Sequence, residues 1–399
     1  MSINPKQIQP ELSPEISLLL ACGRTLVNEE VTDRIRRLAQ GPLDWNSLIK
    51  SSLGHGLMPL LYENLKATAS DLVPQAHLDR LKDFYEKNAA RNIFLTGELI
   101  RILNLFESEG LAGMPYKGPS IAVSIYGQLG LRQFSDLDIL VRKQDVWRCQ
   151  QLLISLGYQP HFNITRRQLP AFLKLGYVQM FTRDNGLSVV ELHWGIVSRF
   201  FMFSLDTDRF WSRLRHMDLM GKRVLAPTPE DLLLILCVHG AKDLWNRLEW
   251  IAGIAELVRS HRDLDWEAAR KLAKESGAER ILFLGLYLAR QLFDAELPDS
   301  IVRRTADEPA IRALATEVRE SLIRPQPHGL RRRILFHVRA KDRGLDRLRY
   351  CARLLFTTTP VDWQILPLPA SLSFLYAFLR PFRLAKKYAS DHSKSLFCS

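Results

Sequence analysis

The stretch FSDLDILV, residues 134–141, carries two aspartates within an apolar run that is typical of a buried strand. Asp136 and Asp138 are two residues apart, and because side chains alternate along a strand, both carboxylates point to the same face. Two carboxylates at one strand end suit Mg²⁺ or Mn²⁺, which complete their coordination with water and nucleotide phosphates. The stretch therefore predicts a divalent-metal site that binds a nucleoside triphosphate.

Two further Asp-x-Asp pairs, Asp206/Asp208 and Asp263/Asp265, occur later in the chain. Their surroundings, LDTDRFW and RDLDWEAARK, are typical of turns or helix starts rather than strands. An aspartate is favoured there because its side chain accepts hydrogen bonds from free backbone N–H groups. We therefore predict that these two pairs are caps or loop residues and bind no metal.

The residues around the first pair predict a compact α+β unit with a small mixed sheet. Segment 110–127 indicates a short strand that ends near Lys117, followed by a helix that begins at Gly118. Residues 145–158 have the spacing of an amphipathic helix, and residues 177–194 have that of a hairpin with an Asn-Gly turn.

Helical patterns flank this unit on both sides, including a long helix expected over residues 77–105. After the unit, Thr228 as an N-cap followed by Pro229 predicts the start of a further helix. A chain of 399 residues is roughly two to three typical domains in length. We predict an N-terminal helical region (1–109), a nucleotide-binding α/β core (110–226), a helical domain (227–325) and a basic C-terminal helical tail (326–399).

The net charge is +12, and much of the excess lies in residues 331–350 and 380–388. A basic surface favours anionic partners, which include nucleotide phosphates, nucleic acid, an acidic polymer and an anionic membrane. Solvated helix faces explain the same pattern. We expect the tail to dock as helices and to offer a surface to an anionic partner, without a transmembrane segment, because the apolar run at 365–379 is too short to span a bilayer.

The five cysteines are scattered and lack Cys-x-x-Cys spacing, which argues against a disulfide framework and against a zinc site. The first residues are polar and do not have the pattern of a signal peptide. These features favour a cytoplasmic protein.

Lys117, Gly118 and Ser120 are candidates for phosphate binding. A helix start presents free amides and a positive dipole end to an anion, and the lysine next to it adds a charge. The alternative is that Lys-Gly-Pro-Ser is a capped loop without a ligand.

Glu191 is the candidate for a third carboxylate. In VVELHW, Glu191 and His193 share one strand face, and a strand adjacent to residues 134–141 would bring Glu191 to the aspartates. An exposed strand glutamate and a structural histidine are the alternative interpretation.

These residues resemble the bacterial uncharacterised nucleotidyltransferase family, part of the DNA polymerase β-like nucleotidyltransferase superfamily. The resemblance rests on YKG (116–118), Ala122, Tyr126, Arg132, SDLDILV (135–141), ELHW (191–194) and LCVHGAKDLWNRLEWI (236–251). It implies a mixed sheet flanked by helices, magnesium and a nucleoside triphosphate. It also implies Asp136 and Asp138 as metal ligands and Glu191 as the third carboxylate.

The resemblance further implies that Arg132, His239, Lys242 and Arg247 contact phosphates or the acceptor, although core and surface roles are the plain alternative. The superfamily usually has Gly-Ser at its first turn, where this chain has Lys117-Gly118. The phosphate contacts of that turn therefore depart from the usual pattern.

The expected function is metal-dependent transfer of a nucleoside monophosphate from a nucleoside triphosphate, such as ATP, to a hydroxyl or phosphate of an unknown acceptor. The alternative is a non-catalytic module of the same fold that binds nucleic acid or an anionic membrane. The three carboxylates favour the enzyme, because a binding module has no need to hold mutually repelling charges together.

Overall fold

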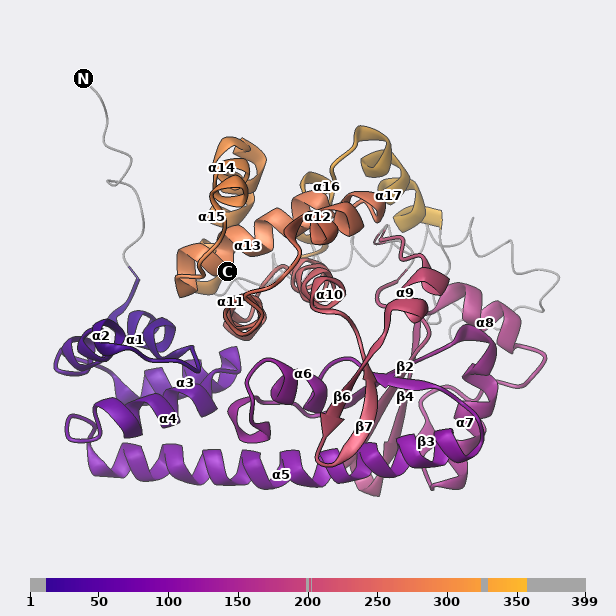
Figure 1. The fold of residues 1–399 in the computed structure, drawn as a ribbon, viewed down its shortest axis with the longest axis horizontal. Coiled ribbons are helices and arrows are strands. Elements are labelled where there is room, and N and C mark those ends of the chain that lie inside the picture. The colour runs from indigo at the N-terminus through magenta and orange to yellow at the C-terminus, as the bar shows by residue number, and fades with distance from the viewer. Residues whose placement is uncertain (1–11, 199–200, 202, 324–328, 357–399) are drawn as a thin grey trace, which may run out of the picture.

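The computed structural model of the chain describes residues 12–198, 201, 203–323 and 329–356 (Figure 1). The strands are β1 (Gly113–Pro115), β2 (Leu137–Val141), β3 (Gln159–Pro160), β4 (Val178–Arg183), β5 (Ser188–His193), β6 (Arg215–Leu219) and β7 (Lys222–Ala226). The helices up to β5 are α1 (Pro14–Cys22), α2 (Glu29–Ala39), α3 (Trp45–His55), α4 (Met58–Thr68), α5 (Gln75–Ser108), α6 (Pro119–Ser124), α7 (Val146–Ser155) and α8 (Leu169–Leu175). The later helices are α9 (Thr207–Arg213), α10 (Pro229–Lys242), α11 (Leu248–Ser260), α12 (Trp266–Glu275), α13 (Glu279–Phe293), α14 (Asp299–Asp307), α15 (Pro309–Ile323), α16 (Leu330–Arg339) and α17 (Gly344–Phe356). Three short 3₁₀ segments are η1 (Leu129–Leu131), η2 (Lys143–Asp145) and η3 (Asp184–Gly186).

A five-stranded mixed sheet with the order β1-β2-β5-β4-β3 forms the centre of the α/β part. Strands β2 and β5 are parallel, whereas the other neighbouring strands are antiparallel. Every residue of β2 is buried, as expected for an apolar strand with a neighbour on each side. The predicted small mixed sheet flanked by helices is confirmed.

The long helix α5 connects the N-terminal helices to the sheet and runs along one edge of the molecule (Figure 1). Its C-terminal half buries apolar residues against β2, β4, β5 and α7 in one hydrophobic cluster. Its middle holds the loop before β2, because the Asn92 side chain donates hydrogen bonds of 2.7 Å to the carbonyls of Leu129 and Arg132. Asn88 donates to the carbonyls of Gly130 and Arg132 at 3.2 Å. The helix therefore fixes the backbone that leads to the two aspartates.

Helices α10, α11 and α13 form a second, tightly packed layer above α6 (Figure 1). Thr228 caps α10 by accepting a hydrogen bond from the backbone N–H of Asp231, as the sequence predicts. Trp245 is fully buried in this layer, and a Cβ at Gly240 would lie only 2.4 Å from its ring. Glycine is needed there because the tryptophan packs directly on the helix backbone.

The structure confirms a strand within residues 134–141, the helix after it and the hairpin of β4 and β5. Strand β2 begins only at Leu137, so Asp136 lies before it and not within it as predicted. The hairpin turns at Asp184, Asn185 and Gly186, which all have positive φ. Strand β1 ends at Pro115, two residues before the position expected near Lys117.

No pattern in the sequence predicts the hairpin of β6 and β7, in which Leu219 pairs with Lys222. Its two-residue turn has positive φ at Met220 and Gly221. Such turns favour Asn or Asp at the first position, so methionine gives no turn signal there.

None of the described helices is both long and apolar enough to cross a bilayer. Within the basic tail, residues 330–356 form α16 and α17, and the apolar run at 365–379 lies outside the described residues.

Candidate functional site

The parallel pairing of β2 and β5 brings the predicted carboxylates together. Asp138 lies directly opposite Glu191 in the register of the two strands. Asp138 is 3% exposed and Glu191 is 30% exposed at the side chain, so the first belongs to the floor of the site and the second reaches solvent. The expectation that these two strands are neighbours is confirmed.

His193 joins the two carboxylates. Its Nε2 lies 3.1 Å from Asp138 Oδ1 and 3.0 Å from Glu191 Oε2. The Tyr116 hydroxyl lies 3.0 Å from Nδ1, and a hydroxyl that donates to Nδ1 leaves the Nε2–H to be shared by both carboxylates. Nothing in the sequence predicts the role of Tyr116. The position of Glu191 and His193 on one strand face is the feature of the sequence that indicates their contact.

Donor atoms of Asp138, Glu191 and His193 all lie within 4.8 Å of one another, which is a spacing that could hold a metal ion. The carboxylate oxygens fit Mg²⁺ and Mn²⁺, and an imidazole nitrogen is also a metal ligand. Asp136 does not belong to this close group, although it lies one residue before β2.

Asp136 shares the electrostatic environment of the group. Burial, together with repulsion from Asp138 and Glu191, raises the pKa of Asp136 to about 6. Three carboxyl groups therefore influence one another at this end of the strands, and Lys117 and Arg132 oppose part of their repulsion. A divalent cation bound here would relieve the repulsion, so the residues present fit the metal that the sequence predicts.

Lys117 forms an ion pair with Asp138, with Nζ 2.6 Å from Oδ1. Burial opposes ionisation of Asp138, but the charge of Lys117 and the hydrogen bond from His193 outweigh it and lower the pKa of Asp138 well below its usual range. Asp138 is therefore an anion at neutral pH, which is the form that binds a metal. Lys117 thus lies at the carboxylates as well as at the predicted phosphate turn.

Gly118 makes the turn that carries Lys117 to Asp138. Its φ of 51° and ψ of −120° belong to a region that glycine adopts readily and other residues rarely do. A Cβ at this position would also lie 3.3 Å from the carbonyl oxygen of Asp136. The glycine is therefore required by both backbone conformation and space.

Gly118→Ala is expected to lower the free energy of unfolding by about 1–3 kcal/mol, because alanine would hold a strained conformation there. Denaturant titration measures the loss. The matched control is Gly97→Ala within α5, where a Cβ would meet nothing within 4 Å and helix propensity favours alanine. Equal stability of the two variants would contradict the role of Gly118.

The other two predicted phosphate ligands at this turn are Gly118 and Ser120, and the structure gives them roles within the protein. The Ser120 hydroxyl is buried and donates a 2.9 Å hydrogen bond to the Lys117 carbonyl. Helix α6 has only six residues and no side-chain cap. Gly118 and Ser120 therefore shape the turn, and their contact with phosphate stays a prediction.

Arg132 and His239 lie together with Lys117 in a small pocket beside the carboxylates. The pocket is lined by Lys117, Ile121, Arg132, Ile235, Leu236, His239, Glu249, Trp250 and Gly253. Burial and the positive charges of Lys117 and Lys242 lower the pKa of His239 well below its usual range. His239 is therefore neutral at pH 7 and would bind a phosphate by hydrogen bonding rather than by charge.

Lys242 does not line this pocket and pairs instead with Asp243 at 3.4 Å. Six of the nine lining residues were not predicted as site residues, and two of these, Glu249 and Trp250, lie in the NRLEWI part of the motif at 236–251. Trp250 meets the His239 ring edge-on at 5.2 Å, and burial raises the pKa of Glu249. The NRLEWI segment thus supplies a polar and an aromatic group to the pocket.

The other Asp-x-Asp pairs lie elsewhere and have the predicted structural roles. Asp206 accepts a hydrogen bond of 3.1 Å from the backbone N–H of Arg209 and caps α9. Asp265 accepts one of 2.9 Å from Ala268 and caps α12.

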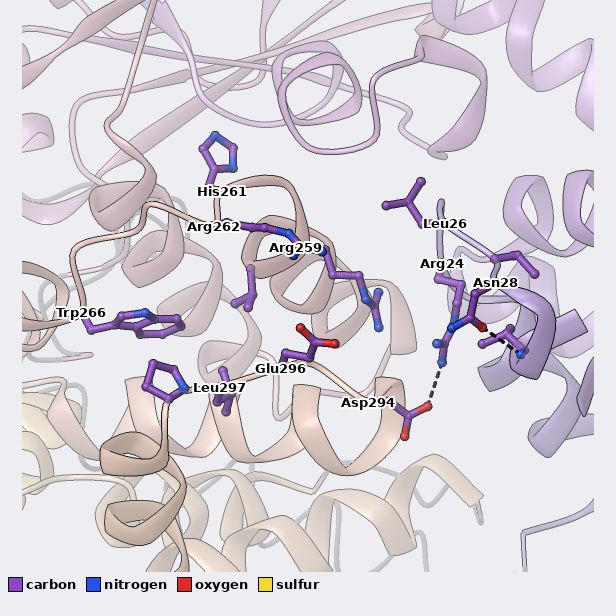
Figure 2. A pocket seen from close by; sticks show the side chains of 14 residues that line it. Arg24, Leu26, Asn28, Arg259, His261, Arg262, Trp266, Asp294, Glu296 and Leu297 are labelled. Carbon is purple, nitrogen blue, oxygen red and sulfur yellow. Dashed lines mark hydrogen bonds and ion pairs between the residues drawn. The ribbon is translucent and has the colours of Figure 1, made fainter.

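A larger pocket, of about 570 Å³, lies between the loop that follows α1 and the C-terminal end of α11. Figure 2 shows Arg24 paired with Asp294 at its wall, at a distance of 2.9 Å. Arg259 pairs with the buried Glu256 behind it. None of the predicted site residues lines this pocket, so size alone does not identify the site.

Comparison with known proteins identifies the family of the chain. The sequence model of the uncharacterised nucleotidyltransferase family matches residues 41–294, which is more than half of the chain and includes every candidate site residue. No curated protein matches the chain. The match shows that the chain belongs to the uncharacterised nucleotidyltransferase family.

Proposed function

We propose that this protein transfers a nucleoside monophosphate from a nucleoside triphosphate to a hydroxyl or phosphate oxygen of an acceptor, with a divalent metal. Membership of the family supports nucleotidyl transfer in general. The observation that carries the metal-dependent reaction is the pairing of Asp138 with Glu191 across β2 and β5, with Asp136 at the edge.

In the proposed reaction, the acceptor oxygen attacks the α-phosphorus of the triphosphate and forms a new P–O bond. The bond between the α-phosphorus and the bridging oxygen breaks, and pyrophosphate leaves with that electron pair. Glu191 accepts the acceptor proton, since it is the most exposed of the close group. His193, held by Tyr116, keeps Asp138 and Glu191 in register.

Asp136, Asp138 and Glu191 would hold the metal, and His193 would orient Asp138 and Glu191 through its Nε2–H rather than bind the ion itself. Bound there, Mg²⁺ or Mn²⁺ would neutralise charge on the triphosphate and on the leaving pyrophosphate. Lys117, Arg132 and His239 line the adjoining pocket, whose volume of about 10 Å³ holds about one water molecule, so the pocket would have to widen for these residues to bind phosphate oxygens. Gly118 and Ser120 shape the turn. Lys242 contributes positive charge from the end of α10.

The test is incubation of the protein with a cell extract, Mg²⁺ or Mn²⁺, and each nucleoside triphosphate labelled at the α- or the γ-phosphate. We expect the α-label to appear on an acceptor and the γ-label to appear in pyrophosphate. Transfer of the γ-label to an acceptor would mean a kinase. Absence of transfer with all four nucleotides and both metals would overturn the proposal.

Arg132→Ala is expected to weaken binding of the metal–nucleotide complex about ten- to a hundredfold, because a charge-assisted hydrogen bond is worth about 1.5–3 kcal/mol. Isothermal calorimetry measures the change. Lys117→Ala should weaken binding similarly and should also lower stability by about 3–5 kcal/mol, because it leaves Asp138 buried without its cation. Lys222→Ala, which breaks the 2.7 Å pair with Glu107, is the control. Unchanged affinity in Arg132→Ala would remove Arg132 from the phosphate site.

A further inference from the structure

Five exposed large apolar side chains belong to the last two described helices, one on α16 and four on α17. These side chains are Leu335, Leu345, Leu348, Leu355 and Phe356, with exposed fractions of 50%, 56%, 67%, 43% and 54%. On α17 the spacing of the four apolar residues places them on one face, and Tyr350 is buried on the other. We refer to these five residues as the α16–α17 surface. An exposed apolar patch of this kind marks an interaction site more often than a single exposed leucine does.

Buried contacts attach α16 and α17 to the rest of the protein. The α16–α17 surface is exposed because these contacts use the other sides of the two helices. Phe336 and His337 of α16 are buried, and His337 Nε2 lies 3.2 Å from the carbonyl oxygens of Ala241 and Lys242. His337 Nδ1 lies 2.8 Å from the hydroxyl of Tyr350, which joins α16 to α17. Figure 1 shows α17 at the edge of the molecule opposite α5.

The same helices are strongly basic. Residues 330–356 contain eight Arg and one Lys against two Asp, so 9 − 2 gives a net charge of +7 with histidine neutral. Arg331, Arg349 and Arg353 are exposed beside the apolar face. Arg349 approaches Asp346 at 3.6 Å with more than half of its side chain exposed, so the pair offsets little of the charge. The α16–α17 surface therefore combines apolar and cationic groups.

We propose that the α16–α17 surface docks on an anionic lipid bilayer, with α17 lying in the plane of the interface. The boundary between headgroups and acyl chains accommodates leucine and phenylalanine, while acidic headgroups pair with the arginines. A nucleic acid would neutralise the arginines but would leave the leucines in water. The inference goes beyond the proposed function and does not depend on it.

The test is co-sedimentation of the full chain with vesicles of phosphatidylcholine, alone or mixed with phosphatidylserine. We expect binding to the mixed vesicles and not to the neutral ones, and a steep loss of binding as salt rises. Arg349→Ala should weaken binding about fivefold, which corresponds to about 1 kcal/mol per arginine near the surface. Leu345→Ser/Leu348→Ser should weaken it at least tenfold, because the apolar contact is lost.

The matched control is Ile93→Ser/Phe94→Ser, which removes an exposed apolar pair from α5 and should leave vesicle binding unchanged. Without vesicles, the Leu345/Leu348 variant should unfold at the parent temperature, since surface substitutions change stability little. A lower unfolding temperature would mean that another part of the chain covers the surface and would overturn the proposal. The proposal also fails if the protein does not bind the vesicles, or if Leu345→Ser/Leu348→Ser binds them as the parent does. Binding of an oligonucleotide in place of the vesicles would contradict it as well. So would loss of a dimer as the sole effect of Leu345→Ser/Leu348→Ser.

Discussion

Asp138→Asn is expected to abolish metal-dependent nucleotide binding and turnover. Asparagine has nearly the same shape and keeps an oxygen for Lys117 and His193, but it leaves the largely buried Lys117 without its counter-ion, so denaturant titration must accompany the assays to show that the variant is folded. A metal supplies several kcal/mol to phosphoryl chemistry, so loss of its buried ligand should reduce turnover by about 10³-fold or more. Calorimetry with ATP and Mn²⁺ or Mg²⁺ measures binding, and release of pyrophosphate measures turnover. Asp136→Asn should act in the same direction.

The control for this result is Asp206→Asn/Asp208→Asn at the start of α9. Asp206 caps that helix through a hydrogen bond from Arg209, and asparagine caps helices about as well as aspartate. The control should therefore keep the parent's stability, metal binding and turnover. The assignment of the site would be overturned if Asp138→Asn retained metal-dependent nucleotide binding and the control lost it.

The elements that the sequence predicts are those with a local physical cause. A short apolar run predicts β2, an Asn-Gly turn predicts the hairpin of β4 and β5, and Thr228 predicts the start of α10. Each of these signals is contained within a few neighbouring residues. The structure confirms all three, and the two capping aspartates, Asp206 and Asp265, follow the same rule.

The contacts of the candidate site depend on segments that are far apart in the chain, and local patterns do not contain them. Lys117 reaches Asp138 only because the Gly118 turn folds back on the backbone of Asp136. His239 comes to the same pocket from α10, about a hundred residues later, and its low pKa arises from burial and from two lysines brought there by the fold. The sequence therefore indicates the carboxylates, whereas it does not predict their hydrogen-bonded neighbours.

Glu191→Gln is expected to keep much of the binding of the metal–nucleotide complex and to lose most of the turnover. Glu191 is 30% exposed at the side chain, whereas Asp138 is 3% exposed, so an acceptor has access to Glu191 first. Glutamine keeps an oxygen that can accept the hydrogen bond from His193 but is not a base. A general base contributes about 10²–10⁴ in rate, so kcat should fall by that factor while KM for the nucleotide changes little.

His193→Ala separates proton transfer from positioning. Loss of His193 leaves the Glu191 carboxylate with its charge and basicity but removes the hydrogen bond that holds it beside Asp138. We therefore expect a smaller fall in kcat than in Glu191→Gln, together with weaker metal binding, because the two carboxylates lose their common donor. If Glu191→Gln turned over within about threefold of the parent, Glu191 would not be the general base, because general bases typically contribute a factor of at least about 10² in rate. The third carboxylate would then have to be sought in Glu249, which is buried in the adjoining pocket and ionises less readily than usual.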